Sequence, residues 1–207
     1  MKKLLHIIAT PRGEDSRTLA VSEAFLGEFH PSHPDWVADT LDLFHEPLPA
    51  LTARRVDGKY VLLAGKDLYG QMRETWQDIL LQIERFRSAD GYLVSTPMWN
   101  FGIPYILKQY LDIIVQPKYL FRVTPDGAEG LVAGRKLVVI TTSGGEYRSP
   151  DSAADDHLEP HLRTLFEFIG VTDLTFIRAQ PMDVDADLRR SRIAEAQQQA
   201  RAAARAF

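Results

Sequence analysis

The sequence predicts an α/β domain of three layers, in which a five-stranded parallel sheet carries helices on both faces. Short apolar runs alternate five times with segments of helical periodicity, and the first of them, KLLHIIA, is typical of a strand buried on both faces. No repeat, linker or change of composition divides residues 1–207, so we expect one domain. Such alternation implies right-handed crossovers between parallel strands, and we expect the strand order 2-1-3-4-5.

Five segments are expected to form the strands of this sheet. The first, KLLHIIA, is followed by a polar segment that Pro11 and Gly13 interrupt, so the strand should end there. The second, WVADTLDL, alternates between apolar and polar residues. The strands are predicted at residues 3–9, 36–43, 91–95, 135–142 and 173–179.

Helices are expected between the strands and after the last one. They are predicted from Ser16 to just before PSHP, from Asp67 to Arg87, and at 104–115, 160–170 and 185–205. The helix at 67–87 is predicted from a single apolar stripe, formed by Leu68, Met72, Trp76, Ile79, Ile83 and Phe86. Residues 44–66 are predicted to be irregular, and turn residues within 117–133 favour a hairpin.

The composition excludes several classes of function. The formal net charge of -4 gives no overall attraction to nucleic acid or anionic lipid. The chain has no cysteine, which excludes disulfides and thiol chemistry, so any redox activity must belong to a bound cofactor. The N-terminal apolar run is short and contains His6, which favours a buried strand over a signal peptide. No run is long enough to span a membrane, and we expect a cytoplasmic protein.

Three loops follow the carboxyl ends of the first, third and fourth predicted strands. They are TPRGEDSRT, TPMWNFG and TSGGEY. In the expected strand order these three strands are neighbours, so their loops meet at one edge of the sheet. Ligands of open parallel sheets bind at that edge, where the strand order reverses.

The first loop contains hydroxyl side chains at Thr10, Ser16 and Thr18, together with Arg17, and it runs into a helix. Hydroxyls and free N–H groups at a helix start bind anions, and a phosphate monoester would fit. The alternative is that Ser16 only caps the helix. No GxxxxGK[ST] or GxGxxG motif is present, which argues against a nucleoside triphosphate or a conventional dinucleotide site.

The second and third loops could hold a flat ligand. Met98 and Trp99 offer faces for a ring. The backbone N–H groups of Asn100 and Phe101, with the Asn100 side chain, offer hydrogen bonds for its polar edge. A tight turn whose aromatic residues fold into the core is the alternative for this loop. The third loop, at 142–145, could place backbone donors along the same ligand, or it could be a plain connection between strand and helix.

Other motifs favour no further chemistry. His157 and His161 lie in HLEPH, but Pro160 is expected to begin a helix between them, so a solvated helix entrance is favoured over a metal site. No GxSxG elbow supplies a hydrolase nucleophile. The first strand ends in Ala9 and Thr10, so the phospho-accepting aspartate of a receiver domain is absent.

Taken together, the segments TPRGEDSRT, PMWNFGIPYILKQYLD and TTSGGEY, with FRVTPDGAEGL and LRTLFEFIGVTD, resemble the FMN-dependent NADH azoreductases, also called FMN-dependent NADH:quinone oxidoreductases. The resemblance covers nearly the whole chain in order. It implies a flavodoxin-like fold, bound FMN, and transfer of hydride from NADH, or NADPH, through FMN to quinones and azo compounds. It also implies a homodimer with its active sites at the subunit interface.

The resemblance assigns roles to individual residues. Those expected to bind the cofactor are Thr10, Ser16, Arg17, Thr18, Pro97, Met98, Trp99, Asn100, Phe101, Thr142, Ser143, Gly144 and Gly145. Those expected to form the substrate pocket are Phe121, Val123, Tyr147 and Phe168. Phe168 matches an aromatic residue that reaches the flavin pocket of the neighbouring subunit. No catalytic side chain and no metal are implied, because the chemistry belongs to the flavin.

Three positions depart from the family pattern. Thr10 stands where Ser is commoner and keeps the hydroxyl, whereas Ser143 and Val123 stand where some members carry Arg and Tyr. The last two lie near the substrate side, so the resemblance leaves the substrate range open. Two other functions remain open on this fold: a flavodoxin-type one-electron carrier, and a nucleotide-binding regulatory module without enzymatic activity.

Overall fold

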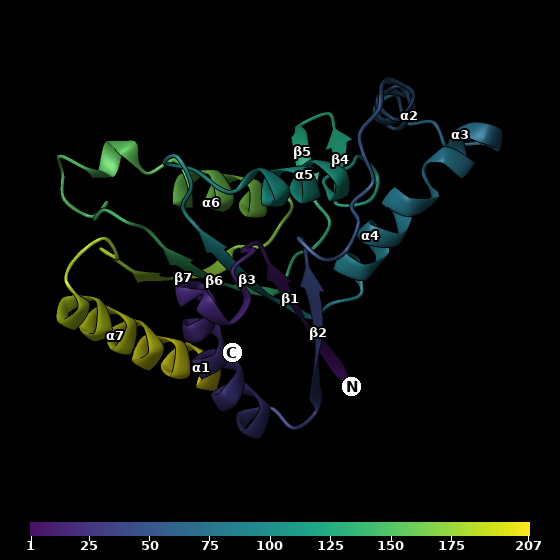
Figure 1. Cartoon of the computed structure of the whole chain (residues 1–207). Coiled ribbons are helices and arrows are strands. Elements are labelled where there is room, and N and C mark those ends of the chain that lie inside the picture. Colours follow the sequence, from purple (N-terminus) through teal and green to yellow (C-terminus); the bar gives the residue numbers. More distant parts are fainter.

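Five parallel strands form the central sheet of the computed structural model, which describes residues 1–207 (Figure 1). They are β1 (Lys2–Ile8), β2 (Trp36–Asp42), β3 (Gly91–Pro97), β6 (Lys136–Thr142) and β7 (Asp173–Ala179), in the spatial order β2-β1-β3-β6-β7. Every neighbouring pair is parallel. The strand order therefore reverses between β1 and β3, which both lie in the interior of the sheet.

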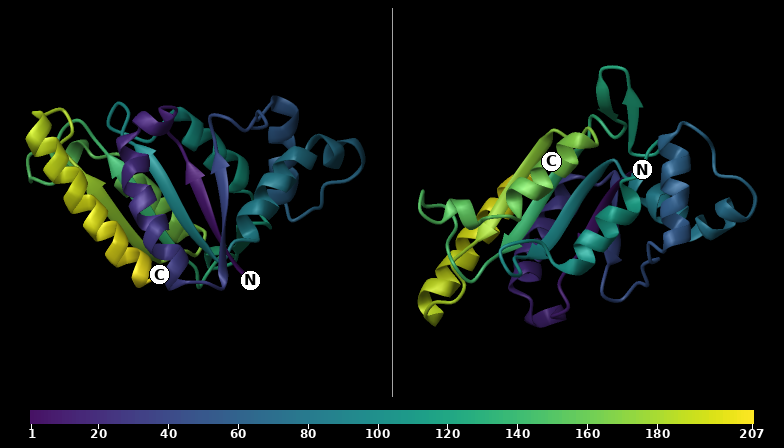
Figure 2. Two further views of the ribbon diagram at one scale, coloured as in Figure 1. Left: turned by 60° about the horizontal axis from the view of Figure 1, so that its bottom comes forward. Right: turned by 90° about the horizontal axis from the view of Figure 1, so that it is seen from above.

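The predicted order 2-1-3-4-5 needs correction, because two short strands come between β3 and β6 in the chain. These are β4 (Phe121–Thr124) and β5 (Gly127–Gly130), which pair antiparallel with each other and stay outside the sheet. The segments predicted as the fourth and fifth strands are β6 and β7. The predicted hairpin within 117–133 is confirmed as β4–β5, and it projects from the body of the protein (Figure 2, right).

Seven α-helices accompany the sheet. They are α1 (Arg17–Ser32), α2 (Ala53–Leu63), α3 (Gly70–Thr75), α4 (Gln77–Arg87), α5 (Tyr105–Ile114), α6 (Glu159–Phe168) and α7 (Ala186–Arg205), with short 3-10 turns at Gly13–Asp15 and Ala153–Asp155. None of them combines the length and the apolar composition that a bilayer crossing requires. Helices α1 and α7 cover one face of the sheet, and α4, α5 and α6 cover the other (Figure 1).

Each face of the sheet contributes to its own hydrophobic core. Because side chains alternate along a strand, Tyr92 and Val94 of β3 pack towards α4, α5 and α6, whereas Leu93 packs towards α1 and α7. The second core contains the small residues Ala196 and Ala200 of α7, which let this helix lie close to α1. Burial on both faces explains why the inner strands are mainly apolar in the sequence.

The single helix predicted from Asp67 to Arg87 is wrong, because the chain breaks at Trp76 into α3 and α4. The prediction that 44–66 is irregular is also wrong, since Ala53–Leu63 forms α2. The two regions meet at one contact. The Trp76 indole is fully buried against α2, where Nε1 donates to the Arg55 carbonyl at 3.0 Å. A Cβ at Gly58 would lie 2.4 Å from that nitrogen, so glycine makes the contact possible.

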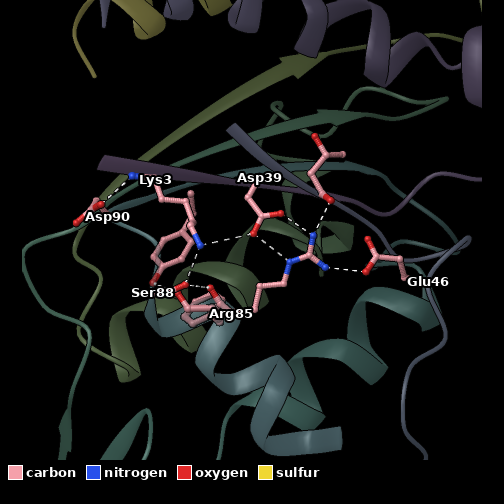
Figure 3. A network of polar contacts seen from close by, with 9 residues as sticks. Lys3, Asp39, Glu46, Arg85, Ser88 and Asp90 are labelled. Atoms are coloured by element: carbon pink, nitrogen blue, oxygen red, sulfur yellow. Dashed lines mark hydrogen bonds and ion pairs between the residues drawn. The ribbon is translucent and has the colours of Figure 1, made fainter. Parts of the chain in front are cut away.

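A charged network joins α4 to the edge strand β2 (Figure 3). The Arg85 guanidinium donates to both carboxylate oxygens of Asp39, at 2.7 and 3.1 Å, and to Glu46 at 2.7 Å. These bonds hold the pKa of Asp39 below its ordinary value and raise that of Arg85. Lys3 lies 4.0 Å from the same aspartate. The network therefore fixes the outer edge of the sheet through side chains that are partly exposed.

Candidate functional site

A cleft of about 250 Å³ opens at the carboxyl ends of β1, β3 and β6. The residues that line it are Thr10, Pro11, Arg12, Ser16, Arg17, Thr18, Pro97, Met98, Trp99, Thr142, Ser143, Gly144, Met182 and Asp183. The three loops singled out in the sequence therefore meet at one edge of the sheet. This edge lies at the reversal of the strand order, where parallel sheets place their ligands.

The first loop supplies hydroxyls and free donors at the start of α1. Ser16 caps the helix, since its Oγ accepts from the Leu19 N–H at 3.3 Å, and this Oγ lies 3.2 Å from Thr10 Oγ1. The backbone N–H groups of Arg17 and Thr18 have no acceptor in the protein. Capping and anion binding are therefore compatible here, because the cap uses only one of the donors.

The second loop is a tight turn between Trp99 and Gly102, whose backbone groups bond to each other at 2.9 and 3.0 Å. Asn100 and Phe101 occupy its corner with φ values of 47° and 69°. These values lie in the left-handed region, which residues other than glycine rarely adopt. The N–H groups of Asn100 and Phe101 have no protein acceptor. Backbone strain and unpaired donors together are typical of a ligand-binding turn.

The third loop lies against a segment that the sequence analysis did not select. The Met182 N–H donates to the carbonyls of Ser143 and Gly144, at 2.9 and 3.0 Å. A Cβ at Gly144 would lie 2.2 Å from Asp183 Oδ2, so a side chain at this position would displace the exposed Asp183 carboxylate. Met182 and Asp183 follow β7, whose carboxyl end reaches the same edge. The sequence holds a signal for them, because the loop after every parallel strand starts at the same edge of the sheet.

Positive charge borders the cleft at Arg12 and Arg17. The Arg17 guanidinium lies 3.3 Å from the Met182 carbonyl and 4.0 Å from the Asp183 carboxylate, so it is held at the cleft wall. The unpaired N–H groups of the first loop and these two cations are groups that could bind an anion. A buried amide donor, Gln180 Nε2, also lacks a partner beside the third loop. The donor set suits a phosphate monoester joined to a flat ring that carries acceptors.

Three residues expected to bind the cofactor do not line this cleft. Asn100 and Trp99 line a second, larger cavity of about 540 Å³, which continues past Tyr105 to His157 and His161. Phe101 is half exposed and meets the Tyr147 ring edge-on at 6.3 Å, and Gly145 lies next to the same ring. Trp99 thus separates the two cavities.

The four residues expected to form the substrate pocket are not gathered in this chain. Phe121 and Phe168 pack together with their ring centroids 4.8 Å apart, and Val123 is exposed on the β4–β5 hairpin. None of them lines the cleft, and Tyr147 stands apart from them beside Phe101.

The HLEPH segment lies at the start of α6. The helix begins at Glu159, so His157 precedes it and His161 lies within it. The structure contains no group of three or more side chains that could hold a metal ion.

The doubly wound sheet and the anion cleft at its point of reversal define a flavodoxin-like protein. Residues 2–204 match a protein family that is described as having a flavodoxin-like fold. The FMN-dependent NADH:quinone oxidoreductase of Ruegeria pomeroyi is 41% identical over 183 residues, 87% of this chain and 90% of that protein. The one of Desulfotalea psychrophila is 36% identical over 97% of this chain and 95% of that protein. This chain belongs to the family of FMN-dependent NADH:quinone oxidoreductases.

Solved structures agree with this assignment. An azoreductase of Bacillus anthracis is 25% identical and superposes with a TM-score of 0.90, with both chains covered completely. An FMN-dependent NADH-azoreductase of the same species, solved in complex with FMN, is 26% identical, with a TM-score of 0.85. That alignment covers 99% of this chain and 100% of the other.

Proposed function

We propose that this protein is an FMN-dependent oxidoreductase that transfers hydride from NADH, through FMN, to quinones and azo compounds. The observation that carries the proposal is the cleft, in which unpaired backbone donors, hydroxyls and two arginines gather at the reversal of the strand order. The names of the relatives, FMN-dependent NADH:quinone oxidoreductase and FMN-dependent NADH-azoreductase, support the same cofactor and donor.

The first loop would hold the phosphate of FMN. Thr10, Ser16 and Thr18 would offer hydroxyls, and the free N–H groups of Arg17 and Thr18 would point at a dianion, which the positive end of the α1 dipole favours. The Arg17 side chain would add a full positive charge. A phosphate monoester has three terminal oxygens, so several of these donors can act together.

The second and third loops would hold the ring. Met98 and Trp99 would lie along it. Beyond Trp99, the Asn100 side-chain amide and the free N–H groups of Asn100 and Phe101 would donate to its oxygens and nitrogens. The glycines at 144 and 145 would let the backbone approach the opposite edge. When bound, FMN supplies the hydride-transfer chemistry. The protein's part is to orient the ring, to shape the pocket above it and to leave space for donor and acceptor in turn.

The colour of the purified protein tests the proposal against both alternatives. We expect a yellow protein that NADH bleaches without oxygen and that a quinone recolours. A yellow protein that NADH does not bleach would be a one-electron carrier, and a protein that takes up no FMN would be a regulatory module. The relatives favour neither alternative. Reduction rates with NADH and with NADPH would show which of the two is the hydride donor. The cytoplasmic location of the protein stays a prediction.

Asn100→Ala tests the role of the second loop. We expect FMN to bind about tenfold more weakly and turnover to slow, because a hydrogen bond to the ring is lost. Asn100→Gly is the matched variant, since it removes the same amide but suits a φ of 47°. If both variants keep the flavin content and the rate of the natural protein, Asn100 has no role at the ring.

The proposal includes a homodimer with its active sites at the subunit interface. The β4–β5 hairpin projects from the fold (Figure 2). Phe168 packs against Phe121 of this hairpin and is 40% exposed, so part of its ring is free for contact with another subunit. Phe168 and Val123 would then reach the cleft of the partner subunit.

The mass of the protein in solution tests this arrangement. Sedimentation should give twice the chain mass of 23.4 kDa. We expect Phe168→Ser to alter the KM for quinones while FMN content stays constant, and a monomeric protein with full activity would contradict this arrangement.

A further inference from the structure

A buried chain of hydrogen bonds lies beneath the cleft, between the sheet and α1. His6 Nε2 lies 2.7 Å from Ser95 Oγ, which lies 2.6 Å from Ser22 Oγ, and Ser22 Oγ donates to the Thr18 carbonyl at 3.0 Å. His6 is 3% exposed, Ser95 is fully buried and Ser22 is 1% exposed. Solvent therefore cannot replace any link of this chain.

The direction of the chain follows from its last acceptor. A carbonyl only accepts, so the Ser22 hydroxyl must give its hydrogen to Thr18, and Ser22 Oγ must accept from Ser95. The Ser95 hydroxyl has then used its hydrogen, so it accepts from the His6 ring. His6 is consequently the tautomer with its hydrogen on Nε2.

The other ring nitrogen agrees with this assignment. His6 Nδ1 is buried and has no hydrogen-bond partner. A hydrogen there would be an unpaired buried donor, so Nδ1 is the bare nitrogen. Burial also lowers the pKa of His6 to about 4, against a smaller opposing effect of Asp42. The ring is therefore neutral at ordinary pH.

The chain ends in the first turn of α1, where the phosphate would bind. Thr18 carries its terminal acceptor, and Thr18 Oγ1 lies 2.7 Å from Thr142 Oγ1 at the end of β6. His6, Ser95 and Thr142 belong to β1, β3 and β6, the three strands whose loops build the cleft. The first turn of α1 is thus tied to each of these strands through side chains.

We propose that His6, Ser95 and Ser22 are positioning residues, which hold the first turn of α1 where its free donors meet the phosphate of FMN. This inference rests on the proposed function. It explains why polar groups occupy sites that apolar residues could fill. Replacing a whole hydrogen-bonded set by apolar groups is often neutral for stability, so stability alone does not require the chain.

Comparison of FMN with riboflavin, which lacks the phosphate, tests the proposal. In Ser95→Ala we expect FMN to bind about tenfold more weakly, while riboflavin affinity is unchanged, because only the phosphate site is displaced. Ser22→Ala should act in the same direction and disturbs the sheet less. Thr141→Val is the matched control: it removes a buried hydroxyl without a partner from the opposite face of β6, and it should leave both affinities unchanged.

A triple variant separates positioning from stability. Combining His6→Leu, Ser95→Ala and Ser22→Ala should restore the melting temperature relative to Ser95→Ala, because no orphaned partner remains. The preference for FMN over riboflavin should stay reduced. The proposal is overturned if the natural protein binds FMN tightly and every variant that folds keeps that preference. A natural protein that binds neither flavin would instead overturn the proposed function, and this inference with it.

Discussion

The His6–Ser95–Ser22 chain lies inside the protein and carries no charge, whereas the Arg85 network lies at the β2 edge and consists mainly of charged groups. Both are well hydrogen-bonded, with distances of 2.6 to 3.0 Å in the first and 2.7 to 3.1 Å in the second. They differ in what replaces a lost partner. Water can reach the side chains at the edge but not those below the cleft, so the neutral chain should be the more sensitive to single substitutions.

The largest expected effect is a pH dependence that arises from His6. Below pH 6.5 the unfolded chain gains a proton at His6, whereas the folded protein gains it only near pH 4. The contribution of His6 to the free energy of unfolding is therefore greatest above pH 6.5 and falls as the pH drops towards 4. At pH 4.5 the loss from this residue should be about 2 to 3 kcal/mol.

Urea unfolding of the natural protein and of His6→Leu, at pH 7 and pH 4.5, measures this effect. Carboxylates titrate in both proteins, so the difference between the two isolates the histidine. Equal losses of stability in the two proteins would show that His6 is not buried and neutral.

The next effect is that of breaking the neutral chain in its middle. Ser95→Ala leaves the His6 Nε2–H without an acceptor and Ser22 without a donor, in a place that excludes water. We expect the free energy of unfolding to fall by about 2 kcal/mol. Urea unfolding at pH 7 tests this, with Thr141→Val as the control. A loss no larger than that of the control would mean that the chain is loosely formed.

A smaller effect is expected for the charged network. Arg85→Gln removes the bonds to Asp39 and Glu46, but both carboxylates remain partly exposed and can be hydrated. We expect a loss of about 1 kcal/mol, which shrinks as salt is added. Urea unfolding of both proteins in low and in high salt measures the loss and its dependence on salt. A loss greater than that of Ser95→Ala would reverse the comparison.

The smallest effect is expected at the surface of the hairpin. Arg122 and Glu129 face each other across β4 and β5 at 2.8 Å, and both are exposed. Glu129→Gln should leave the melting temperature unchanged within error, since exposed ion pairs contribute little. A clear shift would indicate that this surface is covered, as the proposed dimer could do.

The sheet could be predicted from the sequence because strands that are buried on both faces appear there as short, mainly apolar runs. All five strands lie at the predicted segments, and the helices α1, α5, α6 and α7 lie close to their predicted ranges. The helix break at Trp76 could not be predicted, because the apolar stripe continues through it. At the break, Trp76 packs against Gly58 and bonds to Arg55, a contact that the local pattern does not contain.

The cleft could be predicted because its loops follow strands that end at one edge. The contribution of Asp183 was missed, although it follows β7 at that edge. The neutral chain could not be predicted either. A histidine within an apolar run and a serine in GYLVS are each unremarkable in sequence. Only the register of β1 with β3 brings them together, because it pairs His6 with Leu93, two residues before Ser95 on the same face of the sheet.

The corner formed by Asn100 and Phe101 has a consequence for how fast a ligand can be captured. Left-handed backbone costs roughly 1 to 3 kcal/mol at each of these two residues. The free energy of folding already includes this strain, so the turn is formed before a ligand arrives. An arriving ring would therefore encounter donors that are aimed beforehand, with little ordering left to do. Encounter, rather than rearrangement of this turn, should then limit the speed of association.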